Sequence, residues 1–476
     1  MMSKQFYNIN QYWISSADSS KDCYPSSIVL RKAEVLVTTG MWDKATNMYQ
    51  QVLAAGERLG ADPERAESLY RLGEVFRLKS EYPEALEHLS KAMHLYQELR
   101  DGGGTAKTVG AMGGVYGEQG DYQKAIECFS ERKNWAEKTG DKMELGIAWG
   151  NLGVIYAEQK MLDQALECYQ KQKALAEYIG DLVGLSFAYG NSGNIYIHKS
   201  QYETAIDCFQ KQMDLSKRIG DKRALCAVSC NLGLLFKKQA KMEQSLEYFN
   251  QAIRSASEIG YSRVVSQAYG NIATVYQNLG DLEQTEKCLN EYLKLNREVN
   301  DKPGVVIALG KMSKLKERLG DIEKAKALLS ESLDISRDNK FEGLLPILLI
   351  MMGELLLEQN AYSDVAKIAG EAYQVAQKQN NQEQLETVRI LQLLSEIGQG
   401  NISAVAGLIE IAKESIYDEV RLGACMGLYK HTGENIYLKA AGELSDKLYA
   451  ETREVEYKIR MDQLRATQPK EMDTTI

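Results

Sequence analysis

Apolar residues recur three or four positions apart along most of the chain, and each apolar block ends in a turn signal. One block has Leu152, Ile155 and Tyr156, and the next has Ala165 and Tyr169. This spacing places the apolar side chains on one stripe of an α-helix. The pattern therefore predicts a succession of helix pairs, each with a first helix (the A helix) and a second helix (the B helix).

The pairs recur every 40 residues. Nine copies keep this register without insertion or deletion, a tenth keeps little beyond Gly400, and an eleventh pattern returns at 426–444. The small residue of the A helix is Ala33, Gly73, Gly113, Gly153, Gly193, Gly233, Ala273, Ser313 and Gly353 in turn. Regular repeats at this period predict a stack in which each pair buries its stripe against its neighbours.

Gly-Asp dipeptides mark many of the predicted turns. They stand at Gly120-Asp121, Gly140-Asp141, Gly180-Asp181, Gly220-Asp221, Gly280-Asp281 and Gly320-Asp321. Glycine is expected in the left-handed conformation after a helix, and aspartate is expected to cap the next N-terminus. Three of the 6 prolines, Pro63, Pro83 and Pro303, fall where a first helical turn is predicted.

The motif Asn151-Leu152-Gly153, followed by Tyr156, Ala165 and Tyr169, resembles the tetratricopeptide repeat. The resemblance covers about residues 26–445. Its departure is length, because the common repeat has about 34 residues. The 40-residue form is similar to the repeats of partner-of-Inscuteable-type polarity scaffolds and of helical arms attached to bacterial signalling ATPases and cyclases. It implies an all-α, right-handed superhelical α-solenoid of about 10–11 antiparallel helix pairs.

The register also predicts how the chain is divided. We expect an N-terminal extension (1–25), a regular array (26–380), a region of degenerate repeats with a capping helix (381–465) and a disordered tail (466–476). The last three residues, Thr474, Thr475 and Ile476, fit the C-terminal pattern bound by PDZ domains, a match that arises often by chance.

Composition narrows the class of protein. The 476 residues include only 6 prolines, which suits a soluble helical protein. The net charge of −9 gives no overall electrostatic attraction for nucleic acid. No apolar run reaches the roughly 20 residues of a membrane span, and the N-terminus has no hydrophobic signal core. The 8 cysteines show no tight pairs, so we expect a reducing, cytoplasmic location.

Several motifs resemble metal-binding, phosphate-binding or catalytic sites but lack the spacing or partners that such sites need. Cys128, Cys168, Cys208 and Cys288 share one B-helix position, where helices about 8–10 Å apart keep the sulfurs too distant for one zinc ion. Residues 101–108 are rich in glycine but lack the spacing of a phosphate loop. The four histidines form no triad with a nucleophile and a carboxylate. We therefore expect no metal, no cofactor and no enzymatic activity.

An asparagine ladder is the most informative feature. Asn151, Asn191, Asn231 and Asn271 recur at one A-helix position, and in tetratricopeptide superhelices the A helices line the concave groove. An amide can donate to and accept from the main chain of an extended peptide. The preceding glycines, Gly110, Gly150, Gly190, Gly270 and Gly310, would let a ligand backbone approach. The alternative is that the asparagines bond between neighbouring helices and the glycines only ease packing.

The same face is expected to contribute further polar residues about one helical turn along. These are Asn194, His198, Lys237, Lys238, Thr274, Asn278, Lys311, Lys314 and Arg318. The later half of this set is basic, which predicts a partner segment with acidic residues toward that half. A solvated row of lysines is the alternative.

The sequence thus predicts a scaffold or adaptor that binds an extended or helical peptide of a partner protein in its groove. One alternative is a regulatory or sensor arm that controls a partner signalling enzyme when a peptide or ligand binds. Another is an enzyme subunit that uses residues 390–465. Homo-oligomers are compatible with the pattern, and we expect neither nucleic acid nor membrane insertion.

Overall fold

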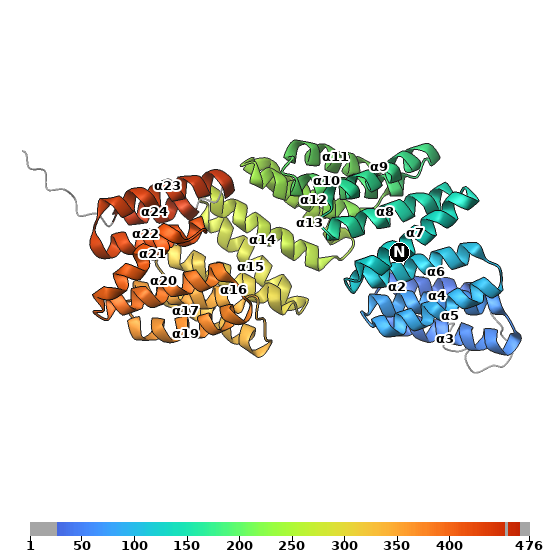
Figure 1. The fold of residues 1–476 in the computed structure, drawn as a ribbon, viewed down its shortest axis with the longest axis horizontal. Coiled ribbons are helices and arrows are strands. Elements are labelled where there is room, and N and C mark those ends of the chain that lie inside the picture. Colours follow the sequence, from blue (N-terminus) through green and yellow to red (C-terminus); the bar gives the residue numbers. More distant parts are fainter. Residues whose placement is uncertain (1–25, 453–455, 467–476) are drawn as a thin grey trace, which may run out of the picture. The chain divides into compact units, whose positions relative to one another are not determined.

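The computed structural model describes residues 26–452 and 456–466, and within these ranges every regular element is a helix (Figure 1). The expected N-terminal extension (1–25) and the C-terminal PDZ-type motif lie outside the described residues. So does the expected tail, apart from its first residue, which ends the last helix. None of the described helices is both long and apolar enough to cross a membrane.

Consecutive helices form the antiparallel pairs that the 40-residue period predicts, so the all-helical solenoid is confirmed. The nine regular pairs are α2 (Ser26–Thr38) with α3 (Trp42–Leu59), α4 (Asp62–Leu78) with α5 (Tyr82–Glu98), α6 (Gly102–Glu118) with α7 (Tyr122–Thr139), α8 (Lys142–Glu158) with α9 (Leu162–Ile179), α10 (Leu182–His198) with α11 (Tyr202–Ile219), α12 (Lys222–Lys238) with α13 (Met242–Glu258), α14 (Ser262–Leu279) with α15 (Leu282–Glu298), α16 (Lys302–Arg318) with α17 (Ile322–Asp338), and α18 (Leu345–Glu358) with α19 (Tyr362–Lys378).

The predicted Gly-Asp turns have the expected geometry. All six glycines adopt φ between 71° and 79°, and the Oδ1 atom of Asp141 accepts a hydrogen bond from the backbone N–H of Glu144 at 3.0 Å. Pro63, Pro83 and Pro303 lie in the first turns of α4, α5 and α16. These local signals therefore set the helix boundaries.

The same left-handed turn recurs where the sequence has no glycine. Residues with positive φ at these points are Ser80, Arg100, Lys160, Ser200, Ala240, Asn300, Lys340, Asn360 and Asn380. Each lies in the turn that follows a helix, at a multiple of 20 in the numbering. The tertiary register imposes this backbone conformation even on side chains that disfavour it by about 1–2 kcal/mol.

Small residues of the A helix and large residues of the B helix interlock within each pair. A Cβ on Gly153 would lie 2.5 Å from Tyr169 Cε1, and one on Gly193 would lie 2.7 Å from Phe209 Cε1. Both rings are buried, at 2 % and 0 % exposure. The absence of a side chain on the A helix thus lets the B-helix ring reach the core.

The described helices divide into two compact units, residues 1–215 and 216–476, with the boundary inside α11. In the first unit the core clusters follow the pairs from α2 to α10. In the second unit they continue from α12 to the last helix. Each cluster joins one pair to the next, as expected for a stack of repeats.

The C-terminal part keeps the helical pairs but varies their lengths. It contains α20 (Gln382–Gly398), the 3₁₀-helix η1 (Ile402–Ala404), α21 (Val405–Glu414), α22 (Asp418–Thr432), α23 (Asn435–Thr452) and α24 (Glu456–Ala466). Apolar side chains of α24, namely Tyr457, Met461 and Leu464, are buried against α22 and α23. This last helix therefore covers the end of the described array.

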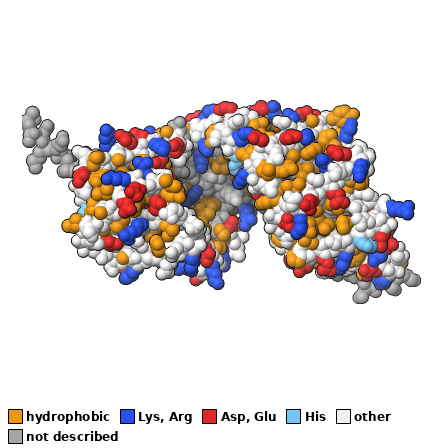
Figure 2. Space-filling view, in the orientation of Figure 1, with side chains coloured by type: hydrophobic (Ala, Val, Ile, Leu, Met, Phe, Trp, Pro, Cys, Tyr) orange, Lys and Arg blue, Asp and Glu red, His pale blue; other side chains and the backbone are white. Residues whose placement is uncertain are grey.

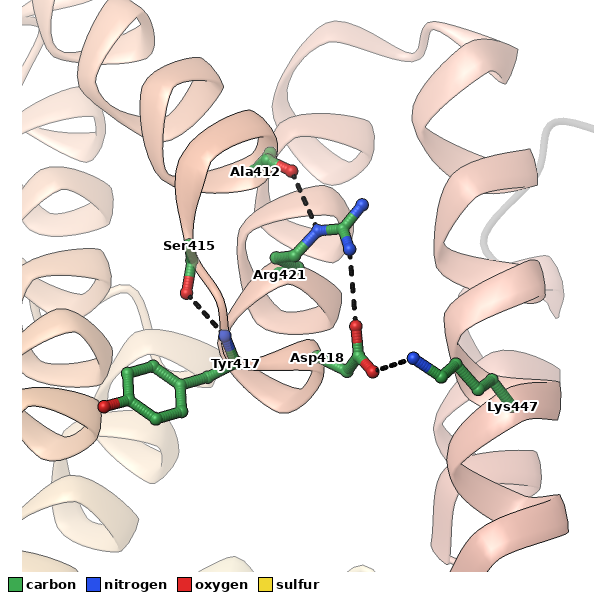
Figure 3. A network of polar contacts seen from close by, with 6 residues as sticks. All are labelled: Ala412, Ser415, Tyr417, Asp418, Arg421 and Lys447. Atoms are coloured by element: carbon green, nitrogen blue, oxygen red, sulfur yellow. Dashed lines mark hydrogen bonds and ion pairs between the residues drawn. The ribbon is translucent and has the colours of Figure 1, made fainter.

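A polar network joins α21, α22 and α23 (Figure 3). The Asp418 carboxylate accepts hydrogen bonds from Lys447 Nζ at 2.5 Å and from Arg421 Nη1 at 3.3 Å. Arg421 Nε donates to the carbonyl oxygen of Ala412 at 3.4 Å. The hydrogen bond from Lys447 holds the pKa of Asp418 below its usual range. Ionised Asp418 thus connects three helices in this region.

Candidate interaction surface

One face of each A helix points away from the packed core. On α10 this face contains Val183, Phe187, Asn191, Asn194 and His198, whose spacing of four, four, three and four residues follows one side of the helix. Phe187 is 57 % exposed and Val183 is 48 % exposed. We call these five positions, together with their equivalents in steps of 40 residues on the other A helices, the A stripe.

Twelve of the thirteen residues predicted for the peptide groove lie on the A stripe. In the first unit they are Asn151, Asn191, Asn194 and His198; in the second they are Asn231, Lys238, Asn271, Thr274, Asn278, Lys311, Lys314 and Arg318. Lys237 stands beside the stripe, one residue before Lys238. The structure therefore gathers the set into one surface on each unit.

The four ladder asparagines are half-buried on the A stripe. Within the described residues, no hydrogen bond ties the side chain of Asn151, Asn191, Asn231 or Asn271 to a neighbouring helix. Each amide keeps its donor and acceptor capacity at a partly open position. The described contacts thus give no support to the alternative in which these asparagines bond between helices.

The glycines that precede the asparagines face the other way, so the expectation that a ligand backbone approaches them is wrong. A Cβ on Gly150 would lie 2.7 Å from Gln172 Nε2, and one on Gly190 would lie 2.5 Å from Gln212 Nε2. One residue along a helix turns the side chain by about 100°. These glycines therefore make room for side chains of the B helix, and the buried glycines at the same register are Gly110, Gly270 and Gly310.

In the second unit the positive charge that the sequence predicts for this face lies on α12, α14 and α16, whereas the A stripe of α18 contains Glu354 and Glu358. On α12, α14 and α16 the A stripe contains no carboxylate, and its basic residues are Arg223, Lys238, Arg263, Lys311, Lys314 and Arg318. Lys311 Nζ donates to Thr274 Oγ1 at 3.1 Å and to the Gly270 carbonyl oxygen at 3.3 Å. Among the described residues, the buried Nη1 of Arg318 has no hydrogen-bond partner.

Apolar members of the A stripe were not among the predicted site residues. Besides Val183 and Phe187, the exposed ones are Leu78, Met143, Val154, Leu234, Ile307 and Ile347, between 38 % and 48 % exposed. Their signal in the sequence is an apolar residue on the same helical face as the asparagines, outside the core stripe. Figure 2 shows hydrophobic side chains among charged ones on the visible face of each unit.

The cysteine ladder and the glycine-rich stretch 101–108 are part of the helical scaffold. The cysteines of the ladder are half-buried or buried, and burial raises the pKa of the Cys128 and Cys168 thiols to about 11. No group of three or more candidate metal ligands occurs among the described residues. The glycine-rich stretch begins α6, where the Asp101 side chain accepts a hydrogen bond from the backbone N–H of Gly104 at 2.9 Å.

Comparison with known proteins identifies the repeat. The tetratricopeptide repeat family matches residues 26–98, 104–177, 185–258 and 264–338, which together make up more than half of the chain. A search of the curated proteins found no match.

Several solved structures are similar in fold. The apo form of the quorum sensor NprR from B. thuringiensis is 15 % identical, with 68 % of this chain and 93 % of that chain covered and a TM-score of 0.49. Aspartyl phosphate phosphatase F from Bacillus subtilis is 16 % identical, with 75 % and 96 % covered and a TM-score of 0.46. A signal transduction ATPase with a tetratricopeptide repeat sensor from Pyrococcus horikoshii is 13 % identical, with 72 % and 54 % covered and a TM-score of 0.48. At these identities the likeness concerns the fold alone.

Proposed function

Because this chain belongs to the tetratricopeptide repeat family of interaction scaffolds, we propose that it is a non-enzymatic adaptor that binds a peptide segment of a partner protein along its A stripe. The observation that carries the proposal is the asparagine ladder. Asparagine disfavours helix interiors by some tenths of a kcal/mol, so four copies at one register need a reason. Their half-buried amides have no hydrogen bond to a neighbouring helix within the described residues.

An extended main chain fits this ladder better than a helix does. The N–H and C=O groups of a helical peptide are already paired, whereas those of an extended peptide are open to side-chain amides. Each amide adds a small contact, and a stacked array has little ordering cost on its own side. We therefore propose that the asparagines hold the peptide main chain and set its direction.

Exposed apolar residues of the A stripe would supply the selectivity that main-chain contacts lack. Phe187 lies one helical turn before Asn191, and Val183 lies one turn further back. Burying such a side chain against a ligand contributes about 1.5–3 kcal/mol. The partner segment should carry an apolar residue that meets Phe187 in the first unit.

The charge of the second unit supports an acidic residue in its ligand. Arg318 contributes a buried guanidinium nitrogen with no partner among the described residues, and its A stripe neighbours on α16 are lysines. A carboxylate satisfies such a nitrogen with a charge-assisted hydrogen bond. We further propose a cytoplasmic setting, which the free thiols of the described cysteines support.

Peptide selection followed by matched substitutions tests this function. Peptides from a random display library are selected on the wild-type chain, and dissociation constants are then measured with the variant Asn231/Asn271→Ala, which removes two ladder asparagines of the second unit. The control is Asn250/Asn290→Ala, which removes exposed asparagines from B helices of the same unit. Losing two hydrogen bonds of about 0.5–1.5 kcal/mol each should weaken binding roughly 5- to 150-fold. Equal loss in both variants, or no loss in either, contradicts the proposal.

The acidic preference has its own measurement. Selected peptides with acidic residues should bind Arg318→Gln more weakly than the wild-type chain, and the difference should shrink as salt rises. If neutral and acidic forms of the same peptide bind equally well, the proposed acidic preference is wrong. The proposed binding of the peptide main chain by the asparagine ladder would be unaffected.

A further inference from the structure

Near the start of the first unit, the chain's own ion pairs occupy the ladder position of the A stripe. On α4 this position is Arg71, whose guanidinium contacts Glu67 at 2.7 Å and Glu34 of α2 at 2.9 Å. Tyr96 Oη also donates a hydrogen bond to Glu67, at 2.9 Å. On α6 the ladder position is Ala111, which has no polar side-chain group. The asparagines of this unit therefore begin at α8.

The A stripes of α8 and α10 repeat one surface. Each helix presents two apolar side chains one turn apart, which are Met143 and Ile147 on α8 and Val183 and Phe187 on α10. Three of them are about half exposed, Met143 at 47 %, Val183 at 48 % and Phe187 at 57 %. The ladder asparagine follows one turn later on each helix. A ligand that crosses both helices therefore meets an apolar pair and an amide twice.

Helix packing sets the interval between the two copies of this surface. Cα atoms of α8 and α10 approach within 8 Å of each other. Packed helices have axes about 8–10 Å apart, so equivalent residues such as Asn151 and Asn191 are separated by about this distance. A ligand must repeat its own contacts at the same interval to use both copies.

A polyproline II segment has this interval, and a β-strand does not. It has three residues per turn and rises about 3.1 Å per residue, so residues i and i+3 point the same way about 9 Å apart. Side chains on one face of a β-strand are about 7 Å or 13 Å apart. An α-helix returns to one face after seven residues, about 10 Å along, but its main-chain groups are already paired. Those of a polyproline II segment are open to side-chain amides.

We propose that the ligand of the first unit crosses α8 and α10 as a polyproline II segment with apolar residues at positions i and i+3. One apolar residue packs on Met143 and Ile147, and the other packs on Val183 and Phe187. The two ladder asparagines bind the main chain beside them. This inference rests on the proposed peptide-binding function and adds the conformation and the residue spacing of the ligand.

Display libraries of fixed spacing test the inference on the full chain. Four libraries carry two leucines among random residues, at i and i+2, i+3, i+4 or i+7, and they are selected together on the wild type. Peptides that bind Phe187→Ala at least about fivefold more weakly are kept, because they use the first unit. The kept peptides should come from the i and i+3 library.

Double-mutant cycles then locate each leucine. Replacing one leucine of a kept peptide by alanine should couple with Phe187→Ala, and replacing the other should couple with Met143→Ala, each by at least about threefold in the dissociation constant. Tyr178→Ala is the matched control, because Tyr178 is 73 % exposed on α9, outside the A stripe. This control should couple with neither leucine.

The outcomes separate this inference from the proposed function. Enrichment of another spacing, or coupling of both leucines to the same helix, overturns the inference. The proposed function still stands in that case if Asn151/Asn191→Ala weakens binding of the kept peptides. If Asn151/Asn191→Ala binds them as tightly as the wild type, both are wrong for the first unit. The absence of any peptide that depends on Phe187 also overturns the inference, and Asn231/Asn271→Ala then tests the proposed function on the second unit.

Discussion

Replacing Gly153 by alanine should destabilise the first unit, although alanine is the better helix former. Gly153 lies inside α8, where a Cβ would meet the Tyr169 ring at 2.5 Å from Cε1, 2.8 Å from Cδ1 and 3.0 Å from Cζ. The ring is only 2 % exposed and packs with Ala165 and Ile195. It has no free space into which to retreat.

The sign of the effect follows from two opposing magnitudes. Overpacking a core costs about 1–3 kcal/mol, and alanine in a helix interior gains about 1 kcal/mol over glycine. The net loss at Gly153 should therefore be about 1 kcal/mol. Gly114 in α6 provides the control, because its nearest neighbour to an added Cβ is Arg77 Cδ at 3.9 Å, an ordinary contact. Gly114→Ala should gain about 1 kcal/mol.

Urea unfolding followed by tryptophan fluorescence measures both variants. All 4 tryptophans lie before residue 215, and Trp149 is on the same helix as Gly153. The signal therefore reports on the first unit alone. With a slope of about 2–3 kcal/mol per M, the midpoint should fall by roughly 0.3–0.5 M in Gly153→Ala and rise by a similar amount in Gly114→Ala. Shifts of the same sign in the two variants would refute the assignment of Gly153 to a packing contact.

Three further predictions concern single sites. Ala240→Gly should raise the stability of the second unit by about 1 kcal/mol in thermal unfolding, because Ala240 has φ 60° and glycine adopts this conformation without strain; a lower midpoint would contradict this. The pKa of Asp418 is lowered by the hydrogen bond from Lys447, so its contribution to stability is present above the unfolded pKa near 3.8 and is lost as the pH falls through the lower folded value. Asp418→Asn should accordingly melt below the wild type at pH 7, with a gap that closes in acid, and a gap independent of pH would count against the network. Burial raises the pKa of Cys230 to about 11, so iodoacetamide should label this thiol at pH 8 at least about tenfold more slowly in the folded chain than in urea, as judged by peptide mass spectrometry; equal rates would disprove its burial.

Sequence periodicity predicted the architecture because a repeat is a local unit. The 40-residue spacing, the Gly-Asp turns and the first-turn prolines act within about 20 residues of one another, so they fix each helix pair without distant information. The same locality placed twelve of the thirteen expected groove residues on one helical face. Their role in binding a peptide stays a prediction, because the sequence pattern of such a helical face does not identify its ligand.

Local signals failed where a side chain depends on the neighbouring helix. Gly150 stands one residue before Asn151, and nothing in the sequence says which of the two meets Gln172. The left-handed turns at Ser80 and Ala240 carry no glycine, so they appear only once helices on both sides are in place. Phe187 was not among the predicted site residues, because the exposure of this apolar side chain depends on how the neighbouring helices pack.

Helix pairing, repeat length and turn positions were thus set by short-range chemistry: apolar spacing, capping and the backbone freedom of glycine. Burial at each position was decided by tertiary packing, because an A helix meets one B helix before it and another after it. The contrast between Val35 and Val75 is the clearest case. The two valines hold the same place in the repeat, and only the presence of α3 makes Val75 core while the described helices leave Val35 exposed.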